Sequence, residues 1–254
     1  MKNELEHIFS TYFSEETAIH CYGDEEHISK LVPLLQALVP FEHPDAYSKV
    51  ENKVLIFEHF EFDSSNNSRN GTQQRKSIAA DDRAFDAVVP TEAGAVYHGQ
   101  IIADYSIENY RNNLKRSFDK HYKEIPEYKN TLRETGVITD TDEVITLFFI
   151  EDRTELGTIF ESKREGVSWE PLILPHCDFF LDLFEKSQDL DMAICASWYP
   201  KQYCLWFIDR TMIAESRGHM VSTSDIKIIN TNPRCLGYKI IIPKDALSEK
   251  INDV

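Results

Sequence analysis

Apolar residues recur along the chain at two spacings, and each spacing predicts a different kind of element. Where they return every three or four residues they mark one face of a helix, and we predict helices over residues 5–12, 25–38, 106–122 and 179–184. Ser106 is well placed as the N-cap of the third helix. Short apolar runs rich in β-branched and aromatic residues predict strands over residues 53–62, 144–150, 193–196, 203–208 and 236–242.

Helical and strand segments alternate along the chain, which indicates an α/β or α+β fold. We expect a mixed central sheet flanked by helices, in a single domain that spans residues 1–254. Residues 1–20 could form a helical N-terminal extension of that domain. The segment 63–76 is polar throughout and is predicted to be the longest loop.

Composition limits the classes of protein to which the chain can belong. No apolar run approaches the roughly 20 residues that a membrane-spanning helix needs. The first ten residues lack the apolar core of a signal peptide, and the five cysteines include no C-x-x-C pair. We therefore expect free thiols and a cytoplasmic protein.

The formal net charge is −16, which disfavours nonspecific binding to nucleic acid. The charge is unevenly distributed, however: residues 1–62 carry −8, residues 63–133 carry +1 and residues 134–254 carry −9. Basic residues in the middle segment cluster on the predicted helix 106–122. Arg111, Lys115 and Arg116 are the candidates for contact with a phosphate backbone.

Two acidic residues stand out in the stretch from Phe41 to Ser65. Asp45 follows Pro44 after a break in the helical pattern, and Glu58 lies inside the most apolar predicted strand. Alternation along that strand places Glu58 on the same face as large apolar residues, whereas His59 and Asp63 point to the opposite face. A carboxylate in apolar surroundings is costly unless a cation or hydrogen-bond donors meet it. Metal-assisted phosphodiester hydrolysis is a chemistry that uses such carboxylates.

The order of these residues resembles the PD-(D/E)XK superfamily, the restriction-endonuclease-like nucleases. The resemblance covers roughly residues 20–65: a helix with an acidic residue (Glu25 or Glu26), then Pro44-Asp45, then Glu58 in an apolar strand. It implies a restriction-endonuclease-like sheet, with Asp45 and Glu58 as ligands of Mg²⁺ or Mn²⁺. Glu26 or Asp63 would complete the ligand set.

One position departs from the family pattern. The family carries a lysine two residues after the acid, and this chain has Phe60 there. His59, Lys53, Lys76 or a basic residue of the helical segment 111–123 could take its role, and His59 is the catalytic candidate alongside Asp45 and Glu58. A Lys or His within about 4 Å of Glu58 and Asp45 would favour an enzyme.

A second placement of the same motif lies further along the chain. Asp142 precedes the predicted strand 144–150, and Glu161-Ser162-Lys163 supplies a complete Glu-x-Lys. Such triplets are frequent by chance in a chain with so many charges, and we rank this placement second.

Two functions remain open on the sequence. The first is a metal-dependent nuclease or phosphodiesterase acting on nucleic acid, for which the resemblance implies a place in bacterial defence or DNA processing. The second is a noncatalytic, degenerate nuclease-like module whose acidic surface would bind a protein partner. Because no P-loop, G-x-G-x-x-G, G-x-S-x-G or H-E-x-x-H motif occurs, other common enzyme classes lack their usual signatures.

Overall fold

A computed structural model describes most of the chain between residues 2 and 240. The described residues are 2–13, 17–21, 25–68, 71–86, 96–101, 104–154, 158–162, 173–199, 202–220, 226–230 and 235–240. Among them, no helix is both long and apolar enough to cross a membrane.

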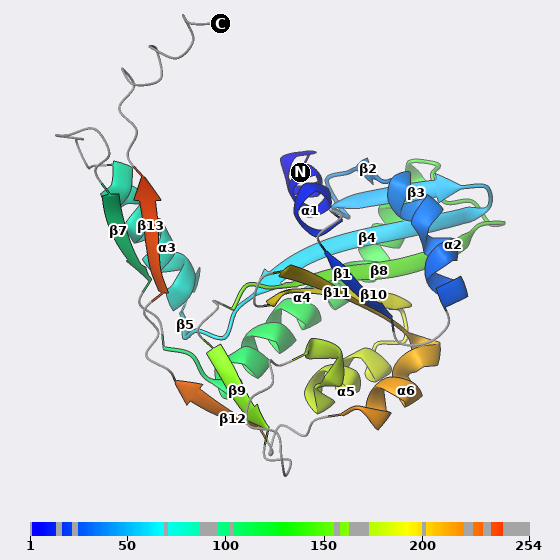
Figure 1. Ribbon diagram of the computed structural model, residues 1–254. Coiled ribbons are helices and arrows are strands. Elements are labelled where there is room, and N and C mark those ends of the chain that lie inside the picture. Colours follow the sequence, from blue (N-terminus) through cyan, green and yellow to red (C-terminus); the bar gives the residue numbers. More distant parts are fainter. Residues whose placement is uncertain are drawn as a thin grey trace, which may run out of the picture.

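Seven strands of the described residues form one mixed sheet (Figure 1). Its order is β1 (Ala18–Cys21), β11 (Gln202–Asp209), β10 (Met192–Tyr199), β8 (Glu143–Asp152), β4 (Lys53–Phe62), β3 (Ala46–Val50) and β2 (Val39–Pro40). The central strands β4, β8 and β10 are parallel, while β3 and β11 run antiparallel to their inner neighbours. The predicted α/β class, with a mixed central sheet between helices, is confirmed.

Strands β4 and β8 are the centre of the sheet because both are apolar on both faces. They pair in register over their full length, from Lys53 opposite Glu143 to Phe62 opposite Asp152. From Val54 to Phe60 every residue of β4 is buried, which is typical of parallel strands covered on both sides. Glu58 and His59 are thus placed inside the protein by the strand that carries them.

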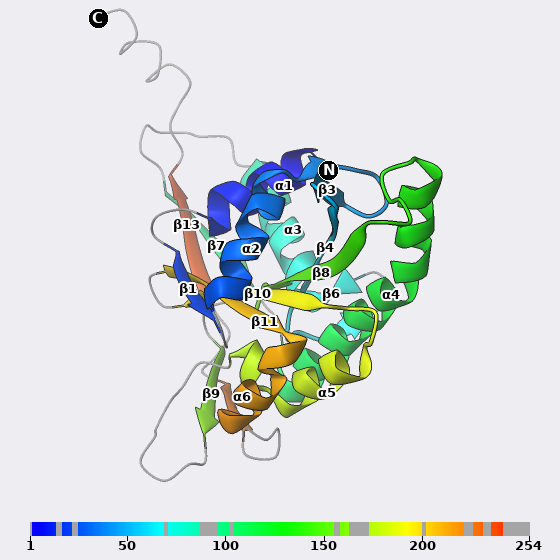
Figure 2. The ribbon, with the colours of Figure 1, turned by 90° about the vertical axis from the view of Figure 1, so that its right-hand side faces the viewer.

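Helices cover both faces of the sheet (Figures 1 and 2). One face packs on α1 (Lys2–Tyr12) and α2 (Glu25–Gln36), through side chains such as Leu55 and Phe57. The other face packs on α4 (Ile107–Glu134) and α5 (Asp178–Lys186), through Ile56 and Phe60. On that second side, the short helix η1 (Leu174–His176) precedes α5, and η2 (Arg210–Met212) and α6 (Ile213–Gly218) follow β11.

Helix α4 connects β4 to β8 across one face of the sheet and is longer than predicted. Ser106 caps its N-terminus by accepting a hydrogen bond from the backbone N–H of Asn109, as expected. The helix continues to Glu134 because Ile125, Tyr128 and Leu132 extend its buried stripe by three turns. Pro126 lies on the exposed side of α4, and the helix continues past it.

The prediction of a long polar loop over residues 63–76 was wrong. Short strands β5 (Asn67–Ser68) and β6 (Gly71–Thr72) pair there, and α3 (Gln73–Asp86) begins directly afterwards. Two further strand pairs lie outside the main sheet: β7 (Val96–Ile101) with β13 (Cys235–Ile240), and β9 (Thr158–Ser162) with β12 (Ile226–Asn230). The expected last strand, 236–242, is therefore a partner of β7, and residues 241–242 lie outside the described residues.

Candidate metal centre

Glu58 lies in the middle of β4, between Phe57 and His59, with its side chain on the face that α4 covers. The residue is 5% exposed. Its neighbours on the same face, Ile56 and Phe60, belong to the apolar core beneath α4. A carboxylate in this position needs partners, because burial among apolar groups disfavours the charged form.

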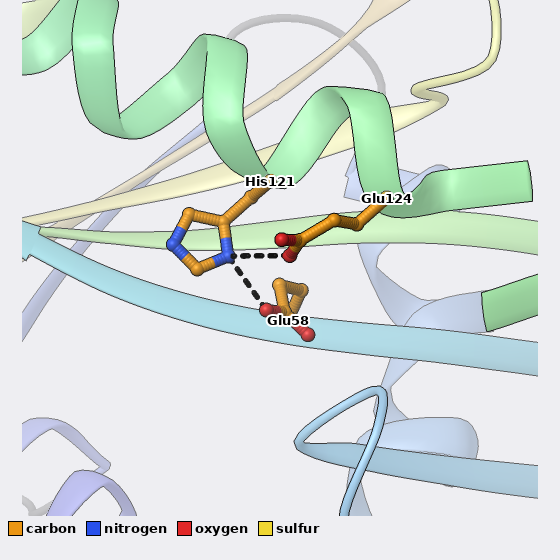
Figure 3. Close-up of side chains that lie close together, drawn as sticks. All are labelled: Glu58, His121 and Glu124. Carbon is orange, nitrogen blue, oxygen red and sulfur yellow. Dashed lines mark hydrogen bonds and ion pairs between the residues drawn. The ribbon is translucent and has the colours of Figure 1, made fainter. Parts of the chain in front are cut away.

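Two side chains of α4 supply those partners (Figure 3). The Nδ1 atom of His121 lies 2.6 Å from the Oε1 atom of Glu58 and 3.9 Å from the Oε2 atom of Glu124. His121 and Glu124 are three residues apart, so they project from the same side of the helix. One ligand atom from each of the three residues lies within 4.8 Å of the other two.

Aromatic residues hold this cluster from two sides. The ring of Phe60 stacks on the imidazole of His121, with centroids 5.1 Å apart. The hydroxyl of Tyr128, one turn beyond Glu124, donates a hydrogen bond of 2.9 Å to Oε2 of Glu124. Burial, together with the carboxylates of Glu58 and Glu124, raises the pKa of Tyr128 well above its ordinary value. Tyr128 therefore stays protonated and acts as a donor.

Two carboxylates and one imidazole are a ligand set that a divalent cation can use. Carboxylate oxygens suit Mg²⁺ and Mn²⁺, and imidazole nitrogen is accepted by Mn²⁺ and by softer ions such as Zn²⁺. Three protein ligands also leave coordination positions for water or substrate, which a catalytic site requires. Glu58, His121 and Glu124 could thus hold a metal ion, although the geometry does not select one metal.

Asp45 lies next to Glu58, as the sequence predicted. The turn at residues 51–52 joins β3 to β4 with Val50 opposite Lys53 and Ala46 opposite Phe57. Continued by one residue, this register brings Asp45 opposite Glu58. The backbone N–H of Asp45 donates to Oε2 of Glu58 (3.2 Å), and Oδ2 of Asp45 accepts from the backbone N–H of His59 (2.8 Å).

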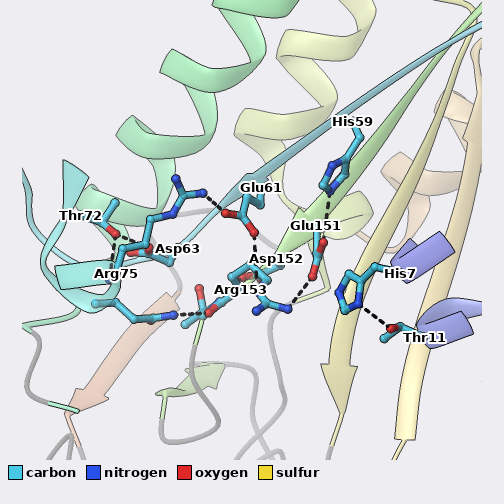
Figure 4. A network of polar contacts seen from close by, with 12 residues as sticks. His7, Thr11, His59, Glu61, Asp63, Thr72, Arg75, Glu151, Asp152 and Arg153 are labelled. Carbon is cyan, nitrogen blue, oxygen red and sulfur yellow. Dashed lines mark hydrogen bonds and ion pairs between the residues drawn. The ribbon is translucent and has the colours of Figure 1, made fainter. Parts of the chain in front are cut away.

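His59 lies on the opposite face of β4 and does not join Glu58. Its Nε2 atom is 3.1 Å from Oε2 of Glu151, a carboxylate that Arg153 also contacts (Figure 4). Oε1 of Glu151 accepts from the hydroxyl of Tyr12 (2.5 Å) and from the guanidinium of Arg153 (2.7 Å). Burial alone would raise the pKa of Glu151, but these hydrogen bonds and the charge of Arg153 outweigh it and lower the pKa to about 2.

The other two predicted metal ligands do not lie with Glu58 either. Asp63 is 1% exposed, and its carboxylate accepts from the backbone N–H and hydroxyl of Ser65 and from the hydroxyl of Thr72 (Figure 4). At about 3.3 Å per residue it is roughly 16 Å further along the chain than Glu58, which is too far to share one ion. Glu26 lies in α2, but its side chain falls outside the described residues.

The second-ranked placement is not brought together by the described residues. Oδ2 of Asp142 accepts from Nζ of Lys49 (2.7 Å) and from the backbone N–H of Thr139 (2.6 Å), which closes the turn before β8. These hydrogen bonds lower the pKa of Asp142 to about 2. Only the backbone of Glu161 is described, in β9, and Lys163 lies outside the described residues.

The basic residues of α4 divide between different sides of the helix. Arg111 is exposed, and Lys115 pairs with Asp119 four residues later, at 2.5 Å. Arg116 borders a groove of about 590 Å³ along α4 that reaches Glu124. The described residues that line this groove are Asn112, Lys115, Arg116, Asp119, Lys120, Lys123 and Glu124.

His121 and Glu124 were not among the predicted site residues. Their signal in the sequence is the pattern His-x-x-Glu on the helix that follows the Glu58 strand, at the edge of that helix's apolar stripe. A basic residue of the segment 111–123 was one of the candidates for the role of the missing lysine near Glu58. His121 lies in that segment, and its Nδ1 atom is 2.6 Å from Glu58.

Comparison with protein families, with curated proteins and with solved structures found no match for this chain.

Proposed function

We propose that the protein is a metal-dependent phosphodiester hydrolase that acts on nucleic acid, with Mg²⁺ or Mn²⁺ held by Glu58, His121 and Glu124. The observation that carries the proposal is the convergence of these three side chains from β4 and α4 on one point. When bound, the ion would polarise the phosphate and lower the pKa of the attacking water.

The surroundings of the cluster support this reaction class over other metal chemistry. The groove along α4 brings Lys120 and Lys123 to the same edge as Glu124, where they would attract a phosphate. The resemblance to the PD-(D/E)XK nucleases adds a second support, because Asp45, directly before β3, contacts Glu58 of the neighbouring strand β4. A restriction-endonuclease-like fold is part of the proposal.

Asp45 has a positioning role in this proposal. Its backbone N–H fixes one oxygen of Glu58, and its carboxylate holds the backbone of His59, so it sets the position of the Glu58 side chain between the two helix ligands. His59 belongs to the Glu151 cluster and contributes no group to the reaction.

The test is a pair of measurements on the wild-type chain: calorimetric titration with Mn²⁺, and cleavage of single- and double-stranded DNA and RNA in Mg²⁺ or Mn²⁺. We expect Glu58→Gln and Glu124→Gln to reduce Mn²⁺ affinity at least tenfold and to abolish cleavage. Glu134→Gln, which removes an exposed acid from the same helix, is the matched control.

A wild-type chain that binds no divalent ion would refute the metal centre. A chain that binds the ion and cleaves none of the four substrates would refute the hydrolase and favour the noncatalytic module. Cleavage that survives both substitutions would show that the site lies elsewhere.

A further inference from the structure

One flank of α4 carries three cations, Arg116, Lys120 and Lys123, that lead toward the candidate metal centre. At 3.6 residues per turn, these three residues and Glu124 fall within about 100° of one another around the helix. All three cations are exposed and border the same groove as Glu124. Arg111 is about 140° from Glu124, on the opposite flank. We call Arg116, Lys120 and Lys123 the basic flank.

None of the three cations of the basic flank forms an ion pair with a carboxylate of the described residues. Arg116 donates to the amide oxygen of Asn113 (3.1 Å), and no described acid forms an ion pair with Arg116, Lys120 or Lys123. Other cations do find partners: Lys115 pairs with Asp119, and Lys129 lies 3.5 Å from Asp189. In a chain of 43 acidic and 27 basic residues, three neighbouring cations that form no ion pair with a described acid make a locally positive surface, although Asp119 and Glu124 border the same groove.

Arg116 also borders a second, smaller hollow of about 80 Å³ at the end of β4. Arg75, Thr72 and Asn113 line it as well, and both of its acids are already engaged. Glu61 pairs with Arg75, and Asp63 accepts from Ser65 and Thr72. The hollow has room for several water molecules, which is enough for a phosphate group.

We propose that the basic flank is the track on which the sugar-phosphate backbone of a nucleic acid strand lies, running from the metal centre to the hollow beside Arg116. This inference rests on the proposed function and specifies where its substrate binds. The eight steps from Arg116 to Glu124 span about 12 Å of helix. Successive phosphates of one strand rise by about 3.4 Å along a duplex axis and lie further apart along the strand itself, so more than one phosphate fits along that distance. The substrate is therefore a chain of several nucleotides.

The test is a binding measurement that needs neither a metal nor cleavage. Fluorescence anisotropy follows the binding of a labelled 12-nucleotide single strand, and of the matching duplex, in EDTA over a series of KCl concentrations. The track variant carries Arg116→Gln, Lys120→Gln and Lys123→Gln. The control carries Arg111→Gln, Arg133→Gln and Lys186→Gln, which changes the net charge equally at exposed cations elsewhere.

We expect the track variant to lose at least tenfold in affinity, and the control to stay within about twofold of the wild type. Each phosphate contact contributes about 0.7 to the slope of log K against log[salt] for a single strand and about 0.9 for a duplex. The slope should therefore become shallower by about 2 for the single strand or by about 3 for the duplex. The form of nucleic acid whose affinity falls more is the preferred substrate. Lys120→Gln alone should change the slope by about one third as much as the track variant does, without altering thermal stability.

Three results would overturn the inference: equal losses in the two triple variants, no loss in either, or competition by poly-glutamate as effective as that by the oligonucleotide. The last result would assign the surface to an acidic protein partner. Glu124→Gln separates this inference from the proposed function, because it should abolish Mn²⁺ binding and cleavage while the salt dependence of binding in EDTA stays that of the wild type. If the basic flank binds strands but the protein cleaves none of them, the hydrolase proposal is refuted and the proposed binding track stands.

Discussion

The imidazole of His121 lies flat on the ring of Phe60, with the two planes inclined by 10° and the ring centroids 5.1 Å apart. Under the proposed resemblance to the PD-(D/E)XK nucleases, Phe60 occupies the position of their lysine. The nitrogen group that meets Glu58 comes instead from helix α4, and Phe60 stacks on it.

The first prediction concerns His121. Replacement by glutamine should lower Mn²⁺ affinity at least tenfold, because the imidazole supplies one of three protein ligand atoms. Calorimetric titration measures the change. His43→Gln is the matched control, since His43 packs against Tyr128 at 4.6 Å between ring centroids but lies outside the ligand cluster. Equal affinities in the two variants would remove His121 from the metal centre.

The second prediction concerns Tyr128, which orients a ligand without being one. Tyr128→Phe removes the hydroxyl that donates to Oε2 of Glu124, and partners of this kind typically change metal affinity by about 10- to 100-fold. We expect a loss of about tenfold in Mn²⁺ affinity, with unfolding in urea little changed because the buried ring remains. Tyr122→Phe on the same helix is the control. A loss of stability without a loss of affinity would mean that the hydroxyl serves the fold alone.

The third prediction separates the two roles that Asp45 could have. Asp45→Ala removes the acceptor that holds the backbone N–H of His59, at a cost of about 1 kcal/mol in the free energy of unfolding. Asp45→Asn keeps an amide oxygen for that hydrogen bond. If Asp45 is a positioning residue, Asp45→Asn should bind Mn²⁺ nearly as well as the wild type. A tenfold loss in Asp45→Asn, equal to that of Glu58→Gln, would instead make Asp45 a metal ligand, as the family resemblance implies.

Local patterns predicted the strand side of this centre. Alternation in β4 placed Glu58 and His59 on opposite faces, and the short distance in sequence between Asp45 and Glu58 is what one antiparallel hairpin needs to bring them together. The helix side was not predictable in the same way. His121 and Glu124 follow Glu58 by more than sixty residues, and only the packing of α4 on the sheet decides which flank of the helix faces β4.

Two other errors have comparable physical causes. Residues 73–76 were assigned to a loop for their polarity, yet these Gln, Arg and Lys residues tolerate a helix well, and α3 begins at Gln73. His59 was assigned to the site because it adjoins Glu58 in sequence. Its actual partner, Glu151, comes from β8, which the parallel pairing of β4 and β8 brings beside it. Contacts between distant segments of this kind leave no local signal.

The last prediction concerns this second cluster and the pH dependence of stability. The pKa of Glu151 falls from 4.5 to about 2 in the folded protein, because hydrogen bonds from His59 and Tyr12 and the charge of Arg153 outweigh the cost of burial. A carboxylate whose pKa is lowered by folding stabilises the protein above the unfolded pKa, and this contribution is lost as the pH falls toward the folded pKa. Between about pH 6 and about pH 3, the loss for this one group amounts to about 2 kcal/mol. Urea unfolding should therefore show a gap between wild type and Glu151→Gln that narrows by about this amount over that range. Glu143→Gln removes an exposed carboxylate from the same strand and is the matched control. A constant gap for Glu151→Gln would mean that the cluster does not hold the charged carboxylate in the way its hydrogen bonds indicate.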